Sequence, residues 1–406
     1  MNFLKTRNFA LFFIGTLISK IGDKLYLLAM PWLIYELTGS SFYMGVMFFL
    51  ETIPFLFISP IAGLLADRFS HKLLLFTAAL SQGLCLLAIV VFHLSRYESI
   101  IPIFIFGFLI ACGGAIFSVV LNSIIPSMFS KDRIVNVNSS FQFIDSTSLL
   151  FGSALAGVLI SLVGAPLVLL IDAVSFLLIA VIVLFYKVSK SNKLKVMKGQ
   201  SFNHLLQGAK YVFKHTTLGP LITIMMLVNI SNAVIVAMLV FYSRDVLGIS
   251  AEQLGLIYTI TAVFQIILTL LIPSITKRFK HINRMLLICL FISCIGIGMV
   301  ALSVEWITLS IAMVVHTAPI IIFNVMNKTL RMQIAPENLL GRVNGLFLML
   351  SKSTLPLAGL LGGVLAEFFD LKIIFGVLSV FTLLIITRYW FHPFNNKENY
   401  SQEKAM

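Results

Sequence analysis

Long runs of apolar residues, separated by short polar segments, occupy most of the 406-residue chain. The runs from Leu73 to Phe92 and from Ile100 to Ile125 contain no charged residue. Apolar runs of about 18 residues or more match the thickness of a bilayer, and in lipid their backbones must form helices to satisfy their hydrogen bonds. The pattern predicts an all-α integral membrane protein with twelve transmembrane helices, at 9–36, 43–65, 73–93, 101–128, 138–161, 166–187, 218–243, 253–276, 284–304, 306–330, 341–366 and 371–392.

The composition excludes a soluble protein and argues against an enzyme. Hydrophobic residues make up 59% of the chain and charged residues 11%, which is too little polar surface to cover a water-exposed core of this size. The four cysteines lie inside apolar runs, where they are packing residues rather than disulfides or metal ligands. No Gly-Lys dipeptide occurs, so the chain lacks a Walker A motif. We expect no metal, no cofactor and no catalytic residues.

Lysine and arginine predict the orientation in the membrane. With the N-terminus placed inside, 23 of the 29 fall on the inner side, and three fall within spans (Lys20, Lys24 and Lys352). The outer side holds only Arg96, Arg244 and Lys372. By the positive-inside rule, both termini are cytoplasmic. The positive residues responsible for the net charge of +13 then lie on the face that contacts anionic lipid, so the charge requires no nucleic-acid partner.

The chain divides into two halves. We expect an N-terminal six-helix bundle at 1–188, a linker at 189–216, and a C-terminal six-helix bundle with a short tail at 217–406. The second part of the linker places Phe202, Leu205, Ala209 and Val212 at helical spacing, which indicates an amphipathic helix on the inner leaflet. A cytoplasmic helix that binds a partner is the alternative.

The two halves carry a weak internal repeat. Arg68, Phe69 and His71 after the second span match Arg278, Phe279 and His281 after the eighth at the same offsets. The segments after the fourth and tenth spans also align. Two parallel repeats of six helices are typical of transporters that work by alternating access around a central site.

The chain resembles the major facilitator superfamily, and within it the bacterial drug:proton antiporters of the macrolide efflux type. The superfamily's loop motif matches Gly63, Asp67, Arg68, His71 and Lys72 between spans two and three. The narrower resemblance rests on the segments Gly22–Tyr26 and Pro31–Ser40, on Glu51 with Pro54, on Ile171–Phe176 and on Gly208–Val212. It implies the major facilitator fold, with two pseudo-symmetric six-helix bundles, in a monomer of the bacterial cytoplasmic membrane. The fourth span has no arginine, so an arginine-based proton relay there does not carry over.

The resemblance gives the loop motif a gating role. Gly63 would allow two helices to approach closely because it has no Cβ. Asp67, Arg68, His71 and Lys72 would lie at the membrane edge, where ion pairs can hold one access state and break in the other. The alternative is that these charges only enforce the topology.

Four acids inside spans are the candidates for proton coupling: Glu51, Asp23, Asp145 and Asp172. Carboxylates in a membrane are costly unless they are paired, hydrated or protonated. Glu51 is the leading candidate because no basic residue lies nearby in its own sequence. Asp23 has Lys20 and Lys24 beside it and could form a structural pair. Asp145 could be hydrated at the inner face, and Asp172 could satisfy a neighbouring helix end.

Glycines supply a second set of candidates: Gly152 and Gly157 in span five, and Gly359, Gly362 and Gly363 in span eleven. The resemblance to antiporters suggests that they form closely packed, kinked helices that favour exchange. Ordinary small-residue packing is the alternative.

These features predict proton-driven efflux of an amphiphilic organic compound, with a macrolide-like antibiotic or another drug as the leading substrate. Its partners are then the substrate, protons and membrane lipid. Export of an endogenous lipid, siderophore or metabolite is the alternative within transport. A non-transporting membrane sensor or scaffold on the same fold is the alternative from another class.

Overall fold

The structure is a computed structural model that describes residues 7–95, 99–128, 131–185, 209–278, 281–336 and 339–392. Within these ranges, the side chains of residues 7–12, 67, 122–128, 131–146, 277, 278, 340 and 341 are not described. Every regular element in the described part is helical. The main helices are α1 (Arg7–Thr38), α2 (Ser41–Arg68), α3 (His71–Leu94), α4 (Ile101–Met128), α5 (Lys131–Val163), α6 (Ala165–Phe185), α8 (Leu218–Phe241), the π-helix η2 (Tyr242–Val246), α9 (Ala251–Arg278), α10 (Ile282–Ala301), α11 (Trp306–Ile334), α12 (Leu340–Ala366) and α13 (Leu371–Trp390).

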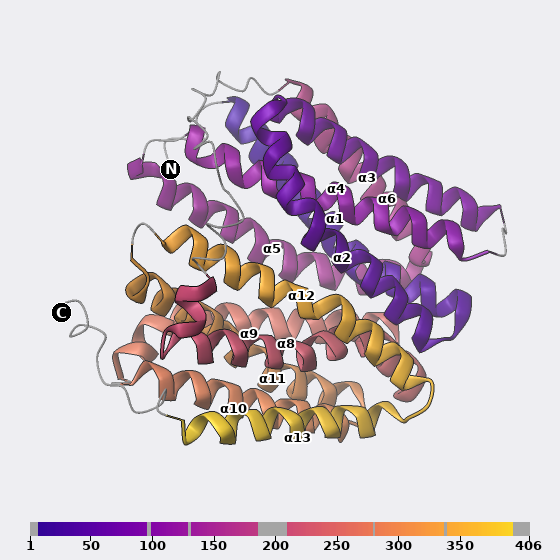
Figure 1. Cartoon of the computed structure of the whole chain (residues 1–406). Helices are drawn as coiled ribbons and strands as arrows, with labels where there is room; N and C mark the ends of the chain where they lie inside the picture. Colours follow the sequence, from indigo (N-terminus) through magenta and orange to yellow (C-terminus); the bar gives the residue numbers. More distant parts are fainter. Residues whose placement is uncertain are drawn as a thin grey trace. The chain divides into compact units, whose positions relative to one another are not determined.

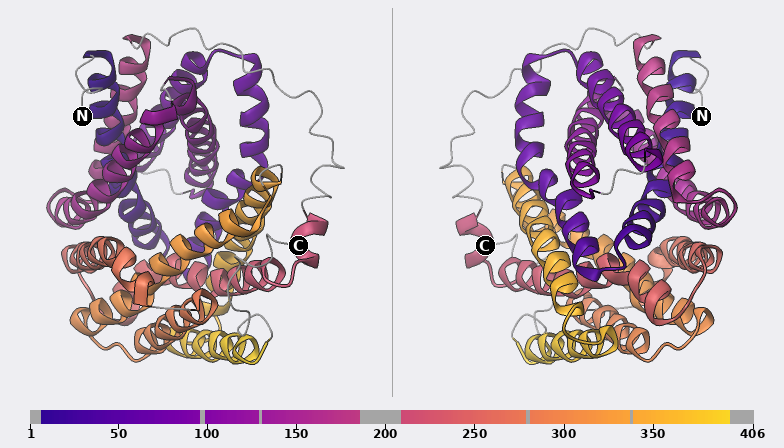
Figure 2. Two further views of the ribbon diagram at one scale, coloured as in Figure 1. Left: turned by 90° about the vertical axis from the view of Figure 1, so that its left-hand side faces the viewer. Right: turned by 90° about the vertical axis from the view of Figure 1, so that its right-hand side faces the viewer.

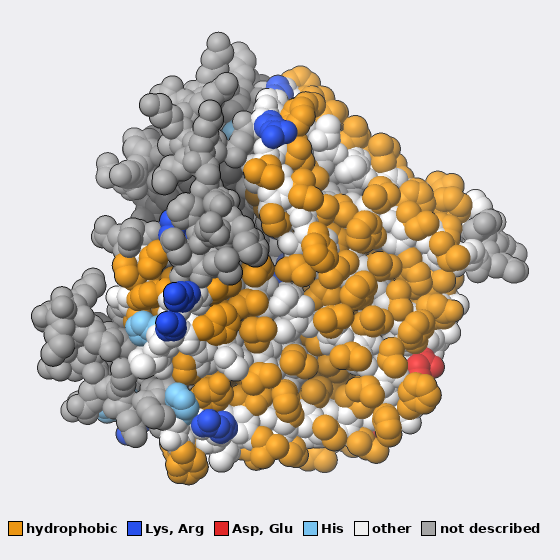
Figure 3. Space-filling model, in the orientation of Figure 1, with side chains coloured by type: hydrophobic (Ala, Val, Ile, Leu, Met, Phe, Trp, Pro, Cys, Tyr) orange, Lys and Arg blue, Asp and Glu red, His pale blue; other side chains and the backbone are white. Residues whose placement is uncertain are grey.

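These helices confirm the twelve predicted spans. Ten of them, α2–α4, α6 and α8–α13, are long and apolar enough to cross a membrane. The remaining two are α1, whose apolar sequence is interrupted by charges, and α5, which contains the apolar stretch Thr147–Val163. Large hydrophobic side chains are exposed along the helices, and they dominate the described part of the face drawn in Figure 3. Such a surface is suited to lipid rather than to water.

Short turns join consecutive antiparallel helices within each half of the chain (Figure 1; Figure 2). Gly39 ends α1 with a φ of 59° and Gly164 ends α5 with a φ of 81°. Their backbone N–H groups donate to the carbonyl oxygens of Tyr35 and Ile160, respectively. Glycine adopts this left-handed conformation without steric cost, so each helix can end and the chain can reverse within a few residues.

The chain separates into two compact units. Unit 1 comprises Met1–Val196 and Ser243–Thr259, and unit 2 comprises Met197–Tyr242 and Ile260–Met406. The segment Ser243–Thr259 therefore belongs with unit 1 although it lies in the second half of the sequence. Two hydrogen bonds hold it there, from the hydroxyl of Tyr35 to Asp245 (2.9 Å) and from that of Ser161 to Glu252 (2.6 Å). The predicted linker up to residue 208 lies outside the described residues.

Four of the main helix pairings recur in the two units. In unit 1, α1 packs on α5 and α6, while α3 packs on α4 and α6. In unit 2, α8 packs on α12 and α13, while α10 packs on α11 and α13. Each pair in unit 2 has an equivalent in unit 1, as two pseudo-symmetric six-helix bundles require.

The core of unit 2 includes the last turn of the predicted amphipathic helix. Residues 209–214 are helical, and Val212 is fully buried among side chains of this core. Tyr211 donates a hydrogen bond to the carbonyl oxygen of Ile334 at the end of α11. Phe213, by contrast, is exposed. Val212 thus packs against protein, and the placement of this helix on the inner leaflet stays a prediction.

Candidate functional site

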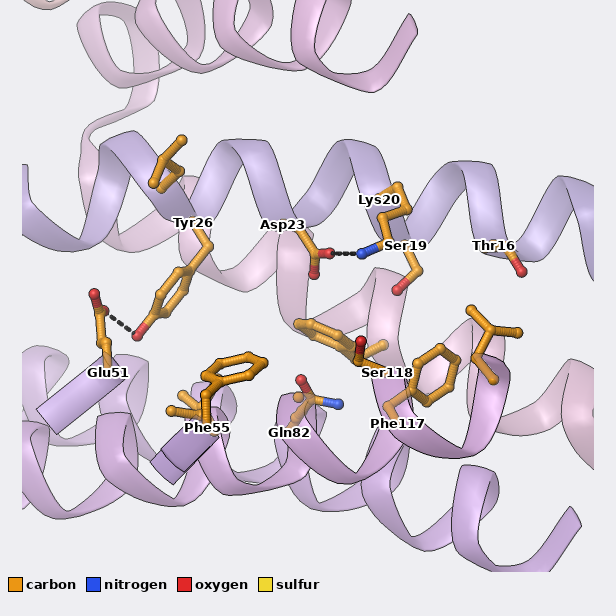
Figure 4. A pocket seen from close by; sticks show the side chains of 16 residues that line it. Thr16, Ser19, Lys20, Asp23, Tyr26, Glu51, Phe55, Gln82, Phe117 and Ser118 are labelled. Atoms are coloured by element: carbon orange, nitrogen blue, oxygen red, sulfur yellow. Dashed lines mark hydrogen bonds and ion pairs between the residues drawn. The ribbon is translucent and has the colours of Figure 1, made fainter. Parts of the chain in front are cut away.

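Unit 1 contains a cavity of about 390 Å³ that combines apolar and ionisable side chains (Figure 4). Its wall comes mainly from α1, α2 and α4, with one side chain each from α3 and α6. Aromatic rings supply much of the apolar lining, namely Phe55, Phe117 and Phe176. The polar lining comes chiefly from α1.

A polar stripe on α1 faces this cavity. Its members follow the helical repeat of three to four residues, which places side chains on one face of a helix. They are Thr16, Ser19, Lys20, Asp23 and Tyr26. The rest of α1 at this depth is largely apolar and packs against α5 and α6. The sequence of α1 thus produces a helix with one polar face in an otherwise apolar bundle.

Lys20 and Asp23 form an ion pair within this stripe. The Lys20 Nζ lies 3.1 Å from Asp23 Oδ2, and the two side chains are 34% and 35% exposed. They are one turn apart, which is the separation that favours such a pair on a helix. Of the two lysines that the sequence offered as partners for Asp23, Lys20 makes the contact. The pair reduces the cost of placing either charge at membrane depth.

Glu51 lies opposite, on α2, and interacts with Tyr26. The Tyr26 hydroxyl donates a hydrogen bond to Glu51 Oε1 at 2.6 Å (Figure 4). Among the described residues Glu51 forms no ion pair. Phe55 lies one turn further along α2 and lines the same cavity. Glu51 is therefore a carboxyl group with a neutral partner in a largely apolar wall, which suits a group that can gain or lose a proton.

Asp172 belongs to α6 and lies in the packed interior of unit 1, outside the lining of the cavity. It is fully buried, and its Oδ1 accepts a hydrogen bond from Ser175 at 3.0 Å. Its Oδ2 has no hydrogen-bond partner among the described residues. A Cβ on Gly22 would collide with Asp172 Oδ1, so the carboxylate is pressed against the backbone of α1 beside Asp23. The alternative that Asp172 satisfies a neighbouring helix end is wrong, because it contacts the middle of α1.

Three of the four predicted acids thus gather around the middle of α1. Glu51 and Asp23 line the cavity, and Asp172 lies outside its lining. The side chain of Asp145 lies outside the described residues. The prediction missed Tyr26 as the partner of Glu51, although its position one turn after Asp23 was a usable signal. It also missed Gln82, which lines the cavity while donating to the carbonyl oxygen of Ala78.

Comparison with known proteins identifies the family. The family model described as the Major Facilitator Superfamily matches residues 12–354. The chain belongs to the Major Facilitator Superfamily. It is therefore a multi-pass membrane transporter, and the fold implied by the sequence is confirmed.

Two relatives in the superfamily differ in how much of the chain they cover. The uncharacterized transporter YfiS of Bacillus subtilis is 28% identical over 169 residues, which span 41% of this chain and 39% of that protein. The staphyloferrin A transporter of Staphylococcus aureus is 24% identical over 403 residues, spanning 94% of this chain and 93% of that protein.

Solved structures of other superfamily transporters have the same fold. The nucleoside transporter NupG matches with a TM-score of 0.75 and 16% identity, over 95% of this chain and 98% of its own. The xylose transporter XylE from E. coli matches with a TM-score of 0.69 and 13% identity, over 96% and 98%. At this identity the likeness concerns the fold and not the substrate.

The superfamily's loop motif lies between α2 and α3. Arg68 ends α2 and is exposed, while Ser70 caps α3 by accepting a hydrogen bond from the backbone N–H of Leu73. Lys72 donates to the carbonyl oxygen of Leu184 near the end of α6, where a helix C-terminus favours a positive charge. The loop is thereby tied to another helix of the same unit. Its role in gating stays a prediction.

Gly63 has no close helix neighbour among the described residues. No atom of the described residues lies within 4 Å of the position that its Cβ would take. Its neighbours Ile61 and Leu64 are exposed, so this side of α2 faces away from the helices it packs on. The close approach expected at Gly63 is not seen among the described residues and stays a prediction. Of the remaining motif residues, His71 begins α3 and is half-buried, and the side chain of Asp67 is not described.

The glycines of α5 do lie at close helix contacts of the superfamily fold. A Cβ on Gly152 would come within 2.6 Å of the Lys24 Cβ on α1. A Cβ on Gly157 would come within 2.6 Å of the carbonyl oxygen of Ala251 and 2.8 Å of the Cα of Gly255. Both glycines therefore permit backbone approaches that a larger residue would prevent.

The glycines of α12 are buried in unit 2. A Cβ on Gly362 would come within 2.8 Å of Val234 on α8, and Gly359 and Gly363 are also buried. This repeats the relation of α5 to α1 in unit 1. A role of these glycines in favouring exchange stays a prediction.

Proposed function

We propose that this transporter exports an amphiphilic organic compound in exchange for protons, and that Glu51 carries the exchanged proton. The observation that carries the proposal is the pairing of Glu51 with the Tyr26 hydroxyl in an aromatic cavity, next to the Lys20–Asp23 pair. The cavity is within the range of about 300–1,000 Å³ typical of small-molecule sites. The proton gradient is the energy source.

The chemistry of the lining favours an amphiphile with a positive charge. Phe55, Phe117 and Phe176 offer apolar surface and ring faces, on which organic cations bind favourably. The two acids exceed the single lysine among the charged lining residues, so the cavity prefers a cation when Glu51 is ionised. A proton on Glu51 removes that preference. Substrate and proton would then compete for one carboxylate, which is what exchange requires.

Export of a siderophore is the second candidate within transport. It is supported by the staphyloferrin A transporter, which aligns with nearly the whole chain. Neither relative supports a macrolide over other amphiphiles, so the drug class rests on the sequence resemblance. A sensor or scaffold remains the alternative of another class, and it predicts that Glu51 is dispensable.

Substitution of Glu51 tests the proposal. We expect E51Q to abolish proton-dependent efflux of the substrate from energised cells or proteoliposomes, because a neutral amide of the same size cannot release a proton. E36Q is the matched control: Glu36 lies on α1 outside the cavity and accepts a hydrogen bond from Trp32. It should transport at the wild-type rate.

The substrate is found first with a susceptibility panel in an efflux-deficient host, including siderophore export under iron limitation. Efflux is then measured with an imposed proton gradient in sodium-free buffer, with and without an uncoupler. Transport that survives the uncoupler, or that is equally fast in E51Q, would refute coupling through Glu51. Loss of transport in E36Q as well would point to a general defect in folding or insertion.

A further inference from the structure

Unit 2 carries an apolar groove between α10 and α13, which pack side by side (Figure 1). The groove has a volume of about 360 Å³. Its lining is almost wholly apolar: Ile288, Phe291, Leu383, Ile386, Trp390 and Phe391, with Thr387 as the polar member. Several of these side chains are exposed, including Phe391 at 81%. The groove therefore opens on the surface of the helices, where lipid lies.

Two arginines flank the end of this groove at which α10 begins and α13 ends. Arg284 precedes Ile288 and Phe291 by four and seven residues, which places it on the same face of α10. Arg388 precedes Phe391 by three residues on α13. Both arginines are exposed, and neither forms an ion pair or side-chain hydrogen bond within the described part of the chain.

The side chains change in character along the groove. Leu383 and Phe291 lie deeper along the helices, whereas Arg388 and Trp390 both lie in the last turn of α13 and Arg284 lies in the first turn of α10. A phospholipid has matching parts, with apolar chains deeper in the membrane and a phosphate in the interfacial region that also suits tryptophan. The positive-inside pattern predicts that this end is cytoplasmic, and the cytoplasmic leaflet is rich in anionic lipid.

We infer that this groove binds one anionic diacyl phospholipid. An acyl chain occupies the space between α10 and α13, and the phosphate is held by the guanidinium groups of Arg284 and Arg388. Arginine suits this task because its planar fork can donate two hydrogen bonds to phosphate oxygens. The site lies on unit 2 and is independent of the cavity in unit 1 and of the proposed transport.

The experiment compares two lipids with the same acyl chains on the purified full-length protein. Phosphatidylglycerol and phosphatidylcholine are titrated in mild detergent, and bound lipid is counted by native mass spectrometry. We expect one tightly retained phosphatidylglycerol on the wild type. The double variant R284Q/R388Q should bind it about thirtyfold more weakly, because it lacks the attraction of two interfacial arginines for the anionic headgroup.

Two further variants separate this site from general lipid contact. K372Q removes a cation from the other end of α13 and should retain the lipid. T387W fills the groove and should displace both lipids. If T387W does not fold, the arginine variant decides the question alone.

Three results would overturn the inference. Equal retention of phosphatidylcholine and phosphatidylglycerol by the wild type would show an ordinary lipid contact. Unchanged binding in R284Q/R388Q, or an equal loss in K372Q, would show that these arginines do not hold the headgroup. A wild type that dimerises through this face and retains no lipid would show that a second copy covers the groove.

Discussion

At the scale of single residues, the acids of unit 1 occupy different surroundings and so suit different tasks. Glu51 faces a cavity and has a hydroxyl partner, and Asp23 is paired with Lys20. Asp172 is fully buried, lies against the backbone of α1 beside Asp23, and leaves one oxygen without a partner among the described residues. An ionised carboxylate in such a position is costly. Asp172 is therefore a packing residue in our interpretation, and Glu51 is the residue proposed to exchange the proton.

This difference predicts the behaviour of D172N. The amide has the same shape, can still accept the hydrogen bond from Ser175, and carries no charge to oppose Asp23. We expect D172N to unfold at a temperature no lower than that of the wild type and to keep proton-dependent transport. Thermal unfolding in detergent and the efflux assay measure the two properties. A folded D172N that has lost proton-dependent transport would move the coupling role from Glu51 to Asp172.

The residue scale is also where the sequence was least informative. Intramembrane acids stand out in an apolar chain, so Glu51, Asp23 and Asp172 were found as candidates without a structure. The hydrogen bond between Tyr26 and Glu51 could not be predicted, because its partners are 25 residues apart and meet only through the packing of two helices. The neighbours of Gly63 could not be predicted for the same reason: a sequence shows that a Cβ is missing but not which neighbour it would meet.

At the scale of helices, hydropathy located the spans well and their ends less well. The predicted span 73–93 falls inside α3, which runs from His71 to Leu94. The predicted span 138–161 falls inside a longer helix, since α5 begins at Lys131. Hydropathy marks the part of a helix that crosses apolar lipid, whereas the backbone hydrogen bonds can continue into polar sequence beyond it.

Close helix contact within unit 1 yields a second prediction, on Gly22. Its missing side chain makes room for Asp172 and Ser175 on α6. G22A must displace the side chains of Asp172 and Ser175 or separate α1 from α6, and overpacking of this kind costs about 1–3 kcal/mol of stability. The matched control is G63A on α2, where a Cβ meets nothing among the described residues. G63A should be neutral or slightly stabilising, because alanine is the better helix former.

Both variants are compared with the wild type by thermal unfolding of the purified protein in one detergent. Equal stability of G22A and G63A would show that the contact between α1 and α6 is softer than the structure indicates. A fall in transport by G63A with unchanged stability would support a gating role for the loop motif. That outcome would distinguish an effect on the gating motion from an effect on helix packing.

At the scale of the whole molecule, the repeat and the charges support one another. Equivalent helices of the two units, such as α3 and α10, are six spans apart, and an even number of crossings returns the chain to the same side. Both of these helices begin next to basic residues, Lys72 in one case and Arg284 in the other. The repeat therefore predicts that these positive charges share one side of the membrane, and the positive-inside rule predicts that this side is cytoplasmic.

Two exposed loop positions test this orientation. Phe69 precedes α3 and is 51% exposed, and Val304 precedes α11 and is 68% exposed. Single cysteines, F69C and V304C, are introduced after the four native cysteines are replaced by alanine. In intact cells a membrane-impermeant maleimide should label V304C and spare F69C, and after permeabilisation it should label both. Labelling of F69C alone in intact cells would show that the topology is the reverse of the predicted one. The basic ends of α10 and α13 would then face outward, which would also remove the cytoplasmic leaflet as the source of the lipid inferred for unit 2.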